Sequence, residues 1–169
     1  MLELRGAPAL SAFRHERLLT VLRECVPEVE ALSAHYVHFI DHHEELDTAF
    51  PERLARLLDY GSQAAQEPLE QAQRFLVVPR LGTQSPWSSK ATDIAHNCGL
   101  SQIHRIERGV DYRVALRGTA TAEQWDAIGA LLHDRMTENV LADTAAVSQL
   151  FAHHSPAPLG SVDILEGGR

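Results

Sequence analysis

The chain has 169 residues, of which 44% are hydrophobic, and its 15 lysines and arginines stand against 23 aspartates and glutamates, for a formal net charge of −8 at pH 7. This length suits one domain or two small fused units and can bury a core without disulfides, while the acidic balance excludes the positive surface of a nucleic-acid or anionic-membrane binder. No apolar run of about 18 residues could span a bilayer, and two isolated cysteines without a secretion signal indicate a reduced, cytoplasmic setting.

The first part of the chain predicts a strand, a helix and a second extended segment. Residues Leu2–Leu4 alternate as in a strand. Ser11 is a suitable N-cap for a helix that continues to about Glu24, and Pro27 prevents a further turn. The β-formers of residues 29–40 indicate a bent strand or a hairpin. The helix is expected to bury one apolar stripe, made of Leu18, Val21, Leu22 and Cys25.

The middle of the chain predicts a short helix, a strand and a longer helix. Pro51 suits the first position of a short amphipathic helix, and residues 63–73 form a polar link. The continuous apolar run Arg74–Pro79 indicates a central, buried strand. A loop then leads to a helix of about Ser89–Asn97, with Gly99 just past its end.

The last part predicts a hairpin, a helix and short final elements. Ile103–Glu107 and Asp111–Leu116 read as two strands joined by a turn at Arg108–Gly109. Thr121–Gln124 has the form of a capping box that opens a helix. The remaining elements are a strand at 137–141, a small helix at 143–151 and a linker at 155–158.

The order of these elements nearly repeats, as β-α-β-(β)-α and then β-α-β-β-α-β. We therefore predict an α+β fold of two fused ferredoxin-like halves, with an antiparallel sheet and helices on one face. The halves would span about 1–62 and 74–142 of a domain over 1–142. Residues 143–169 would be a small helix and the start of a linker, and we expect a longer protein to continue beyond them.

Ten histidines make a metal site the first functional alternative. Four of them lie within nine residues, but in a strand His35 and His38 would point to opposite faces. No His or Cys spacing matches a zinc motif, and no G-x-S-x-G turn or activated cysteine indicates a nucleophile. We therefore expect neither a bound metal nor a catalytic residue in this chain. The four clustered histidines are His35, His38, His42 and His43.

The segment Pro79–Ile94 differs, because it runs from the end of a buried strand to the start of a helix. Helix starts leave backbone N–H groups unpaired and attract anions, phosphate above all, and Lys90 is the only lysine of the chain. Phosphate binding or domain contact is therefore one interpretation. Its candidate residues are Arg80, Thr83, Ser85, Trp87, Ser88, Ser89, Lys90 and Asp93.

The other interpretation is a well-capped helix with no ligand. Ser85 could be the N-cap with Pro86 at the first helical position, or Ser88 could be the cap, and Trp87 would then belong to the core. The placement of glycine and lysine does not fit a Walker A loop. Three arginines of the expected hairpin could add charge to the loop but are better explained as surface strand residues: Arg105, Arg108 and Arg113.

One long stretch carries a specific resemblance. Residues Val77–Val114, VVPRLGTQSPWSSKATDIAHNCGLSQIHRIERGVDYRV, closely resemble the signature of the N-terminal domain of large-type formylglycinamide ribonucleotide amidotransferase, also called phosphoribosylformylglycinamidine synthase. The opening LRGAPALSAFR and the later LHDRMTENVL, LFAHHSPAP and SVDIL are similar to the same family. The resemblance covers essentially the whole chain, with Leu81 and Gln84 as tolerated variants.

This resemblance implies a place in purine biosynthesis. The family makes formylglycinamidine ribonucleotide from formylglycinamide ribonucleotide, ATP and glutamine, with Mg²⁺. A C-terminal glutaminase domain releases ammonia through a Cys-His-Glu triad, and a central synthetase domain uses the ATP. The N-terminal domain is similar to a dimer of a small subunit that bridges these two activities in other lineages, in agreement with two ferredoxin-like halves.

The resemblance also implies what this chain would and would not bind. Its partners would be the synthetase and glutaminase domains, with the ribonucleotide substrate at the loop, and the chain would hold no cofactor and be inactive alone. Two rival interpretations remain: a stand-alone ferredoxin-like assembly or phosphate-binding module without catalysis, and a small phosphate-binding enzyme. The second rival is weak, because only Asp93 and His96 could serve as a base near the loop.

Overall fold

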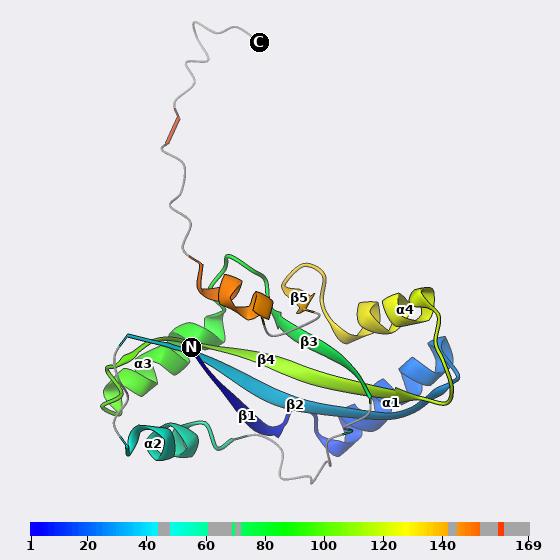
Figure 1. The fold of residues 1–169 in the computed structure, drawn as a ribbon, viewed down its shortest axis with the longest axis horizontal. Helices are drawn as coiled ribbons and strands as arrows, with labels where there is room; N and C mark the ends of the chain where they lie inside the picture. The colour runs from blue at the N-terminus through cyan, green and yellow to red at the C-terminus, as the bar shows by residue number, and fades with distance from the viewer. Residues whose placement is uncertain (44–47, 61–68, 70–71, 142–144, 153–158, 161–169) are drawn as a thin grey trace, which may run out of the picture.

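The computed structural model describes residues 1–43, 48–60, 69, 72–141, 145–152 and 159–160. Figure 1 shows a long, twisted sheet with helices packed against it. The elements are β1 (Leu2–Pro8), α1 (Ala12–Cys25), β2 (Val29–His42), α2 (Phe50–Leu57), β3 (Gln73–Pro79), α3 (Pro86–Asn97), β4 (Ile103–Leu116), α4 (Ala122–Leu132), β5 (Glu138–Leu141) and the 3-10 helix η1 (Ala145–Phe151). The linker predicted at 155–158 lies outside the described residues.

The sheet has five strands in the order β1-β2-β4-β3-β5, and every neighbouring pair is antiparallel. The α+β class with helices packed on an antiparallel sheet is therefore confirmed, and it is consistent with a ferredoxin-like fold. The 14-residue strands β2 and β4 pair along most of their length. The division into halves at 1–62 and 74–142 stays a prediction; the β2–β4 pairing joins the strands of both.

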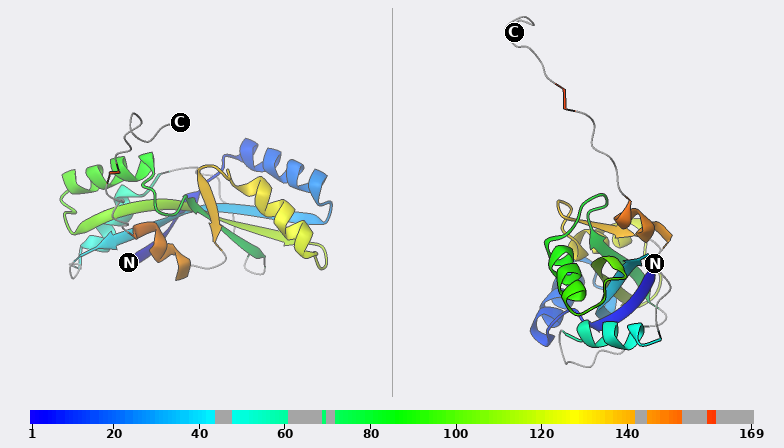
Figure 2. Two further views of the ribbon diagram at one scale, coloured as in Figure 1. Left: turned by 90° about the horizontal axis from the view of Figure 1, so that it is seen from above. Right: turned by 90° about the vertical axis from the view of Figure 1, so that its left-hand side faces the viewer.

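The two faces of the sheet carry different elements. On β3 the side chains alternate, so that Phe75 and Val77 pack with α1 and α4, whereas Leu76 and Val78 pack with η1. The left view of Figure 2 shows α1 and α3 on one side of the sheet and η1 on the other. Helix α4 lies on the same side as α1, because both pack against Phe75 and Val77. The face that carries α1, α3 and α4 is called the helix face below.

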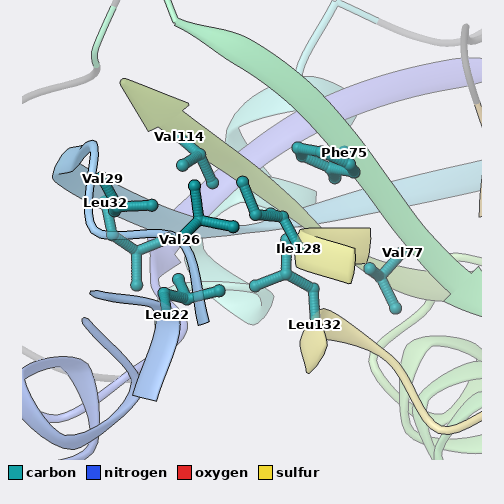
Figure 3. Close-up of a cluster of buried hydrophobic side chains, with 9 residues drawn as sticks. All are labelled: Leu22, Val26, Val29, Leu32, Phe75, Val77, Val114, Ile128 and Leu132. Carbon is teal, nitrogen blue, oxygen red and sulfur yellow. The ribbon is translucent and has the colours of Figure 1, made fainter. Parts of the chain in front are cut away.

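The core consists of three apolar clusters along the sheet. One lies under α1 and α4 and is drawn in Figure 3, where Leu22 and Val26 point toward Ile128 and Leu132. A second contains buried residues of α2 and α3 together with Ile106 of β4. The third lies between η1 and the opposite face of the sheet.

Two predicted features of the helices are corrected. In α1 the buried stripe consists of Leu18, Leu19 and Leu22 followed by Val26, whereas Val21 and Cys25 are exposed. The apolar residues of α1 form two overlapping stripes, one that includes Val21 and one that includes Leu19. The stripe with Leu19 is the one that packs in the cluster under α4. Helix α3 begins at Pro86, earlier than the expected Ser89, because Ser85 is its N-cap.

The predicted turn at Arg108–Gly109 is wrong, because β4 runs without interruption from Ile103 to Leu116. A Cβ atom built on Gly109 would lie 2.7 Å from the carbonyl oxygen of Val77 on β3. This glycine therefore allows two strands to approach closely and makes no turn. Strand β3 lies between β4 and β5, so it is an inner strand but not the central one.

Candidate functional site

The N-terminus of α3 is fixed by the side chain of Ser85. Its hydroxyl accepts a hydrogen bond from the backbone N–H of Ser88 at 3.0 Å and donates one to Oε2 of Glu107 at 2.9 Å. Pro86 occupies the first helical position, where its missing N–H leaves no bond unmade. Of the two caps that the sequence allowed, the structure therefore has Ser85, and Ser88 is buried inside the first turn.

The loop 80–85 is held from β4 by a buried ion pair. Glu107 is fully buried and accepts hydrogen bonds from the backbone N–H of Ser85 at 3.3 Å and from Nε of Arg105 at 3.0 Å, and it also pairs with Nη2 of Arg105. Nη2 of Arg105 donates to the carbonyl oxygen of Thr83 at 2.7 Å. Arg105 is only 8% exposed, so its interpretation as a surface residue is corrected.

The other side of the same loop is held by the segment that enters β5. The backbone N–H of Arg80 donates to the carbonyl oxygen of Thr137 at 2.9 Å, and that of Leu81 donates to Oδ1 of Asn139 at 3.1 Å. The hydroxyl of Thr83 donates to the carbonyl oxygen of Arg80 at 2.6 Å, which closes the turn. The loop backbone is thus bonded on both sides, while the side chains of Arg80, Thr83 and Gln84 are exposed.

A second arrangement on the helix face surrounds the guanidinium group of Arg108. Its Cζ atom lies 4.3 Å from the ring centroid of Tyr36, 4.7 Å from that of Trp87 and 5.7 Å from that of Tyr60. Aromatic ring faces attract cations at such distances. We call Tyr36, Tyr60 and Trp87 the aromatic cage. It collects residues from β2, from the segment after α2 and from α3 around one cation of β4.

A chain of hydrogen bonds leads from this cation to a buried histidine. Nη1 of Arg108 donates to the Tyr60 hydroxyl at 3.4 Å, and that hydroxyl lies 2.6 Å from Nε2 of His38. Burial and the neighbouring Arg108 charge lower the pKa of His38 to about 4. The imidazole is therefore neutral at pH 7, and its Nε2 can accept the Tyr60 proton. Burial also raises the pKa of Tyr60, against the opposing effect of Arg108.

A cleft of about 510 Å³ opens beside the cage and brings several predicted site residues together. Its walls include Arg80, Thr83, Ser85 and Trp87, along with Arg108. This volume falls within the range of small-molecule sites, about 300–1,000 Å³. With two guanidinium groups, hydroxyls and aromatic rings, the cleft is suited to hold an oxyanion attached to a small organic group.

The other four predicted site residues lie apart from this cleft. Lys90 lines an adjacent cavity of about 360 Å³, which shares Trp87 and Arg108 with the cleft. Ser88 is buried in α3, and Ser89 and Asp93 are exposed on that helix. A phosphate-binding role for any of the eight predicted residues stays a prediction.

Sequence patterns alone do not identify the residues of the other elements that complete the site. The sequence carries no local sign of a role for Tyr36, Tyr60 or Glu107, and for Arg108 it predicts a turn or surface strand position from which charge could be added to the loop. The alternation of strand residues does group Tyr36 with His38, since residues at alternate positions of one strand share a face. With β4 read as one strand, the pairing of His38 with Arg108 would have placed both beside Tyr36.

The described part of the chain offers no metal centre. Within it, no group of three or more His, Cys, Asp or Glu side chains could hold an ion together. His35 and His38 are buried, and neither is part of such a group. No helix among the described residues is long and apolar enough to cross a membrane.

A family model of the formylglycinamide ribonucleotide amidotransferase N-terminal domain matches residues 35–151, more than half of the chain. The chain belongs to this family. The match contains the loop 80–85, the whole aromatic cage and the buried Arg105–Glu107 pair, so these features lie within the family domain. The parent enzyme of this domain is an amidotransferase of purine biosynthesis.

Proposed function

We propose that this amidotransferase domain docks the glutaminase and synthetase domains of its parent enzyme against each other and helps to keep ammonia away from water. We further propose that the loop 80–85 and the start of α3 face the synthetase cleft, with Lys90 near the phosphate of the ribonucleotide substrate. ATP, Mg²⁺ and glutamine would bind to the other domains. The isolated chain would then be inactive.

The observation that carries this proposal is the way the loop is held. Its backbone is bonded to Glu107 and Arg105 of β4 on one side and to Asn139 of β5 on the other. The side chains of Arg80, Thr83 and Gln84 are nevertheless exposed to solvent. A surface loop with a pre-organised backbone and exposed polar groups loses little entropy when a partner binds it.

The surface next to the loop supports contact with another protein surface. Met136 lines the cleft and is 75% exposed, and Ile94 is 51% exposed on the same helix as Lys90. On α1, Phe13 is 72% exposed. Covering these side chains with another domain would remove apolar area from water, which favours association. A bridging domain needs such surfaces on more than one side.

The test is Lys90→Ala in the intact parent enzyme, with Arg117→Ala as a matched control. Both variants remove one exposed positive charge, but Arg117 follows the end of β4, outside the cleft and the adjacent cavity. Loss of a contact to phosphate should cost about 1–3 kcal/mol of binding free energy. We expect Lys90→Ala to raise the KM for the ribonucleotide by about 5- to 150-fold, and Arg117→Ala to leave it unchanged.

The ammonia-dependent and glutamine-dependent rates separate the two parts of the proposal. If Lys90→Ala changes neither the KM for the ribonucleotide nor the ammonia-dependent kcat, the substrate part fails. Loss of glutamine-dependent turnover alone would assign the loop to the coupling of the two activities. Turnover by the purified 169-residue chain would overturn the docking role and favour a small enzyme.

A further inference from the structure

The aromatic cage holds a cation without neutralising it. Its rings attract Arg108 through their faces, but among the described residues they accept one hydrogen bond from it, at the Tyr60 hydroxyl. Arginine carries five N–H donors in a planar fork. Among the described residues the rest of that fork has no protein partner, and no carboxylate forms an ion pair with Arg108.

The other arginines of β4 show how unusual this is for the strand. Arg105 pairs with Glu107, and Arg113 lies 3.6 Å from a carboxylate oxygen of Asp111. Arg108 is half-buried like Arg113, yet it meets rings instead of an acid. A half-buried guanidinium held at a fixed place by rings keeps its charge and its donors for a group that comes from outside.

The position of Arg108 gives those donors access to a ligand. It lines both the 510 Å³ cleft, which it shares with Arg80, and the 360 Å³ cavity, which it shares with Lys90. The cleft also contains one acidic residue, Glu138, whose Oε2 accepts a hydrogen bond from the backbone N–H of Asp134 at 2.9 Å. Cations thus outnumber anions along the walls.

We propose that Arg108 is the anion-binding residue of the cleft and that it takes the phosphate group of a small sugar phosphate, with the cage holding the guanidinium in place. A phosphate monoester carries a charge of about −1.5 to −2 at pH 7. It therefore balances the charges of two arginines better than a singly charged carboxylate ligand would. The concave shape fits a small molecule rather than a protein surface. That the phosphate belongs to a sugar phosphate rests on the proposed function, in which the substrate is a ribonucleotide.

The cage has a definite role in this arrangement. A free arginine side chain samples many rotamers, and binding an anion would have to order it. Contact with Tyr36 and Trp87 orders the guanidinium before the ligand arrives. Tyr36 and Trp87 are therefore positioning residues for Arg108, and the phosphate itself would contact the edge of the fork.

The test is titration calorimetry of the 169-residue chain with inorganic phosphate and with ribose 5-phosphate at constant ionic strength. The variants are Arg108→Gln, Arg108→Lys and the charge-matched control Arg117→Gln. We expect Arg108→Gln to lower the affinity for ribose 5-phosphate at least tenfold and Arg117→Gln to change that affinity less than twofold. Arg108→Lys, which keeps the charge without the planar fork, should lie between them.

A second measurement does not depend on the folding of the Arg108 variants. In a Trp125→Phe chain, Trp87 is the one remaining tryptophan and lies beside Arg108. We expect its emission to change saturably with ribose 5-phosphate. Absence of both heat and an emission change in the native and Trp125→Phe chains would overturn the proposal, and so would an equal loss of affinity in Arg108→Gln and Arg117→Gln.

Succinate separates phosphate from carboxylate recognition. If it binds as tightly as ribose 5-phosphate, the cleft recognises carboxylates and the phosphate assignment is overturned. These measurements need none of the partner domains. Phosphate binding that persists while the docking role fails would therefore refute the proposed function and leave the role of Arg108 standing.

Discussion

Replacement of Glu107 by alanine tests whether the buried ion pair holds the loop 80–85. Glu107 is fully buried, and its removal leaves the guanidinium of Arg105, 8% exposed, without its carboxylate. Removing one partner of a buried ion pair typically lowers the free energy of unfolding by about 3–5 kcal/mol. Arg105 keeps its bond to the Thr83 carbonyl and its contact with the Phe151 ring, so we expect a value near 3 kcal/mol, about the lower end of that range.

The assay is urea unfolding of native, single-variant and double-variant chains. In Glu107→Leu/Arg105→Met both charges are absent, and such a double replacement is often close to neutral. We therefore expect the double variant to be more stable than Glu107→Ala. The control is Glu30→Ala, which removes the exposed Arg117–Glu30 pair and should cost about 0–1 kcal/mol. The reasoning is refuted if Glu107→Ala is no less stable than Glu30→Ala.

Two further predictions concern the pH response and the glycines. The pKa of His38 is about 4 in the folded chain and 6.5 in the unfolded chain. Between these two pH values only the unfolded chain binds the proton, so the free energy of unfolding falls as the pH falls from 6.5 to 4. Between pH 7.5 and 4.5 native protein should lose about 2–3 kcal/mol more than His38→Phe in urea titrations; parallel losses would contradict the assignment. Gly109→Ala should lower stability by about 1–3 kcal/mol, since its Cβ meets the Val77 carbonyl oxygen. Gly129→Ala should raise stability by about 0.5–1 kcal/mol, because alanine favours a helix over glycine and the added Cβ would lie at an ordinary van der Waals distance, 3.5 Å, from the Phe75 ring of β3. Thermal melts that show the same sign for both glycine variants would be inconsistent with this argument.

The features that could be predicted from the sequence are those fixed by neighbouring residues. The N-cap at Ser11 and the capping box of Thr121 and Gln124 form as expected, since a cap involves residues only three positions apart. The stretch 79–94 stands out in the sequence for the same reason, because its polar residues and Pro86 lie close together along the chain. Four of its candidates do line one cleft.

The features that could not be predicted depend on distant partners. The dipeptide Arg108–Gly109 carries a turn signal of its own, but both of its residues pair with β2 and are kept extended. The surroundings of Arg108 also depend on distant residues, since the three rings around its guanidinium group belong to Tyr36, Tyr60 and Trp87. No local sequence pattern predicts which strands are neighbours in the sheet. The order of the strands, however, determines which side chains come into contact.

The register of the sheet has a consequence for the order of folding. Val77 pairs with Val110, 33 positions later, whereas His38 pairs with Arg108, 70 positions later. Closing a chain segment of twice the length costs roughly 0.6 kcal/mol more in entropy, so the β3–α3–β4 unit should form first and bring Ser85 onto Glu107. The aromatic cage needs β2 and Tyr60 as well. It is therefore complete only when the slow, long-range strand pairing has occurred, and the emission of Trp87 should report the last step of folding rather than the first.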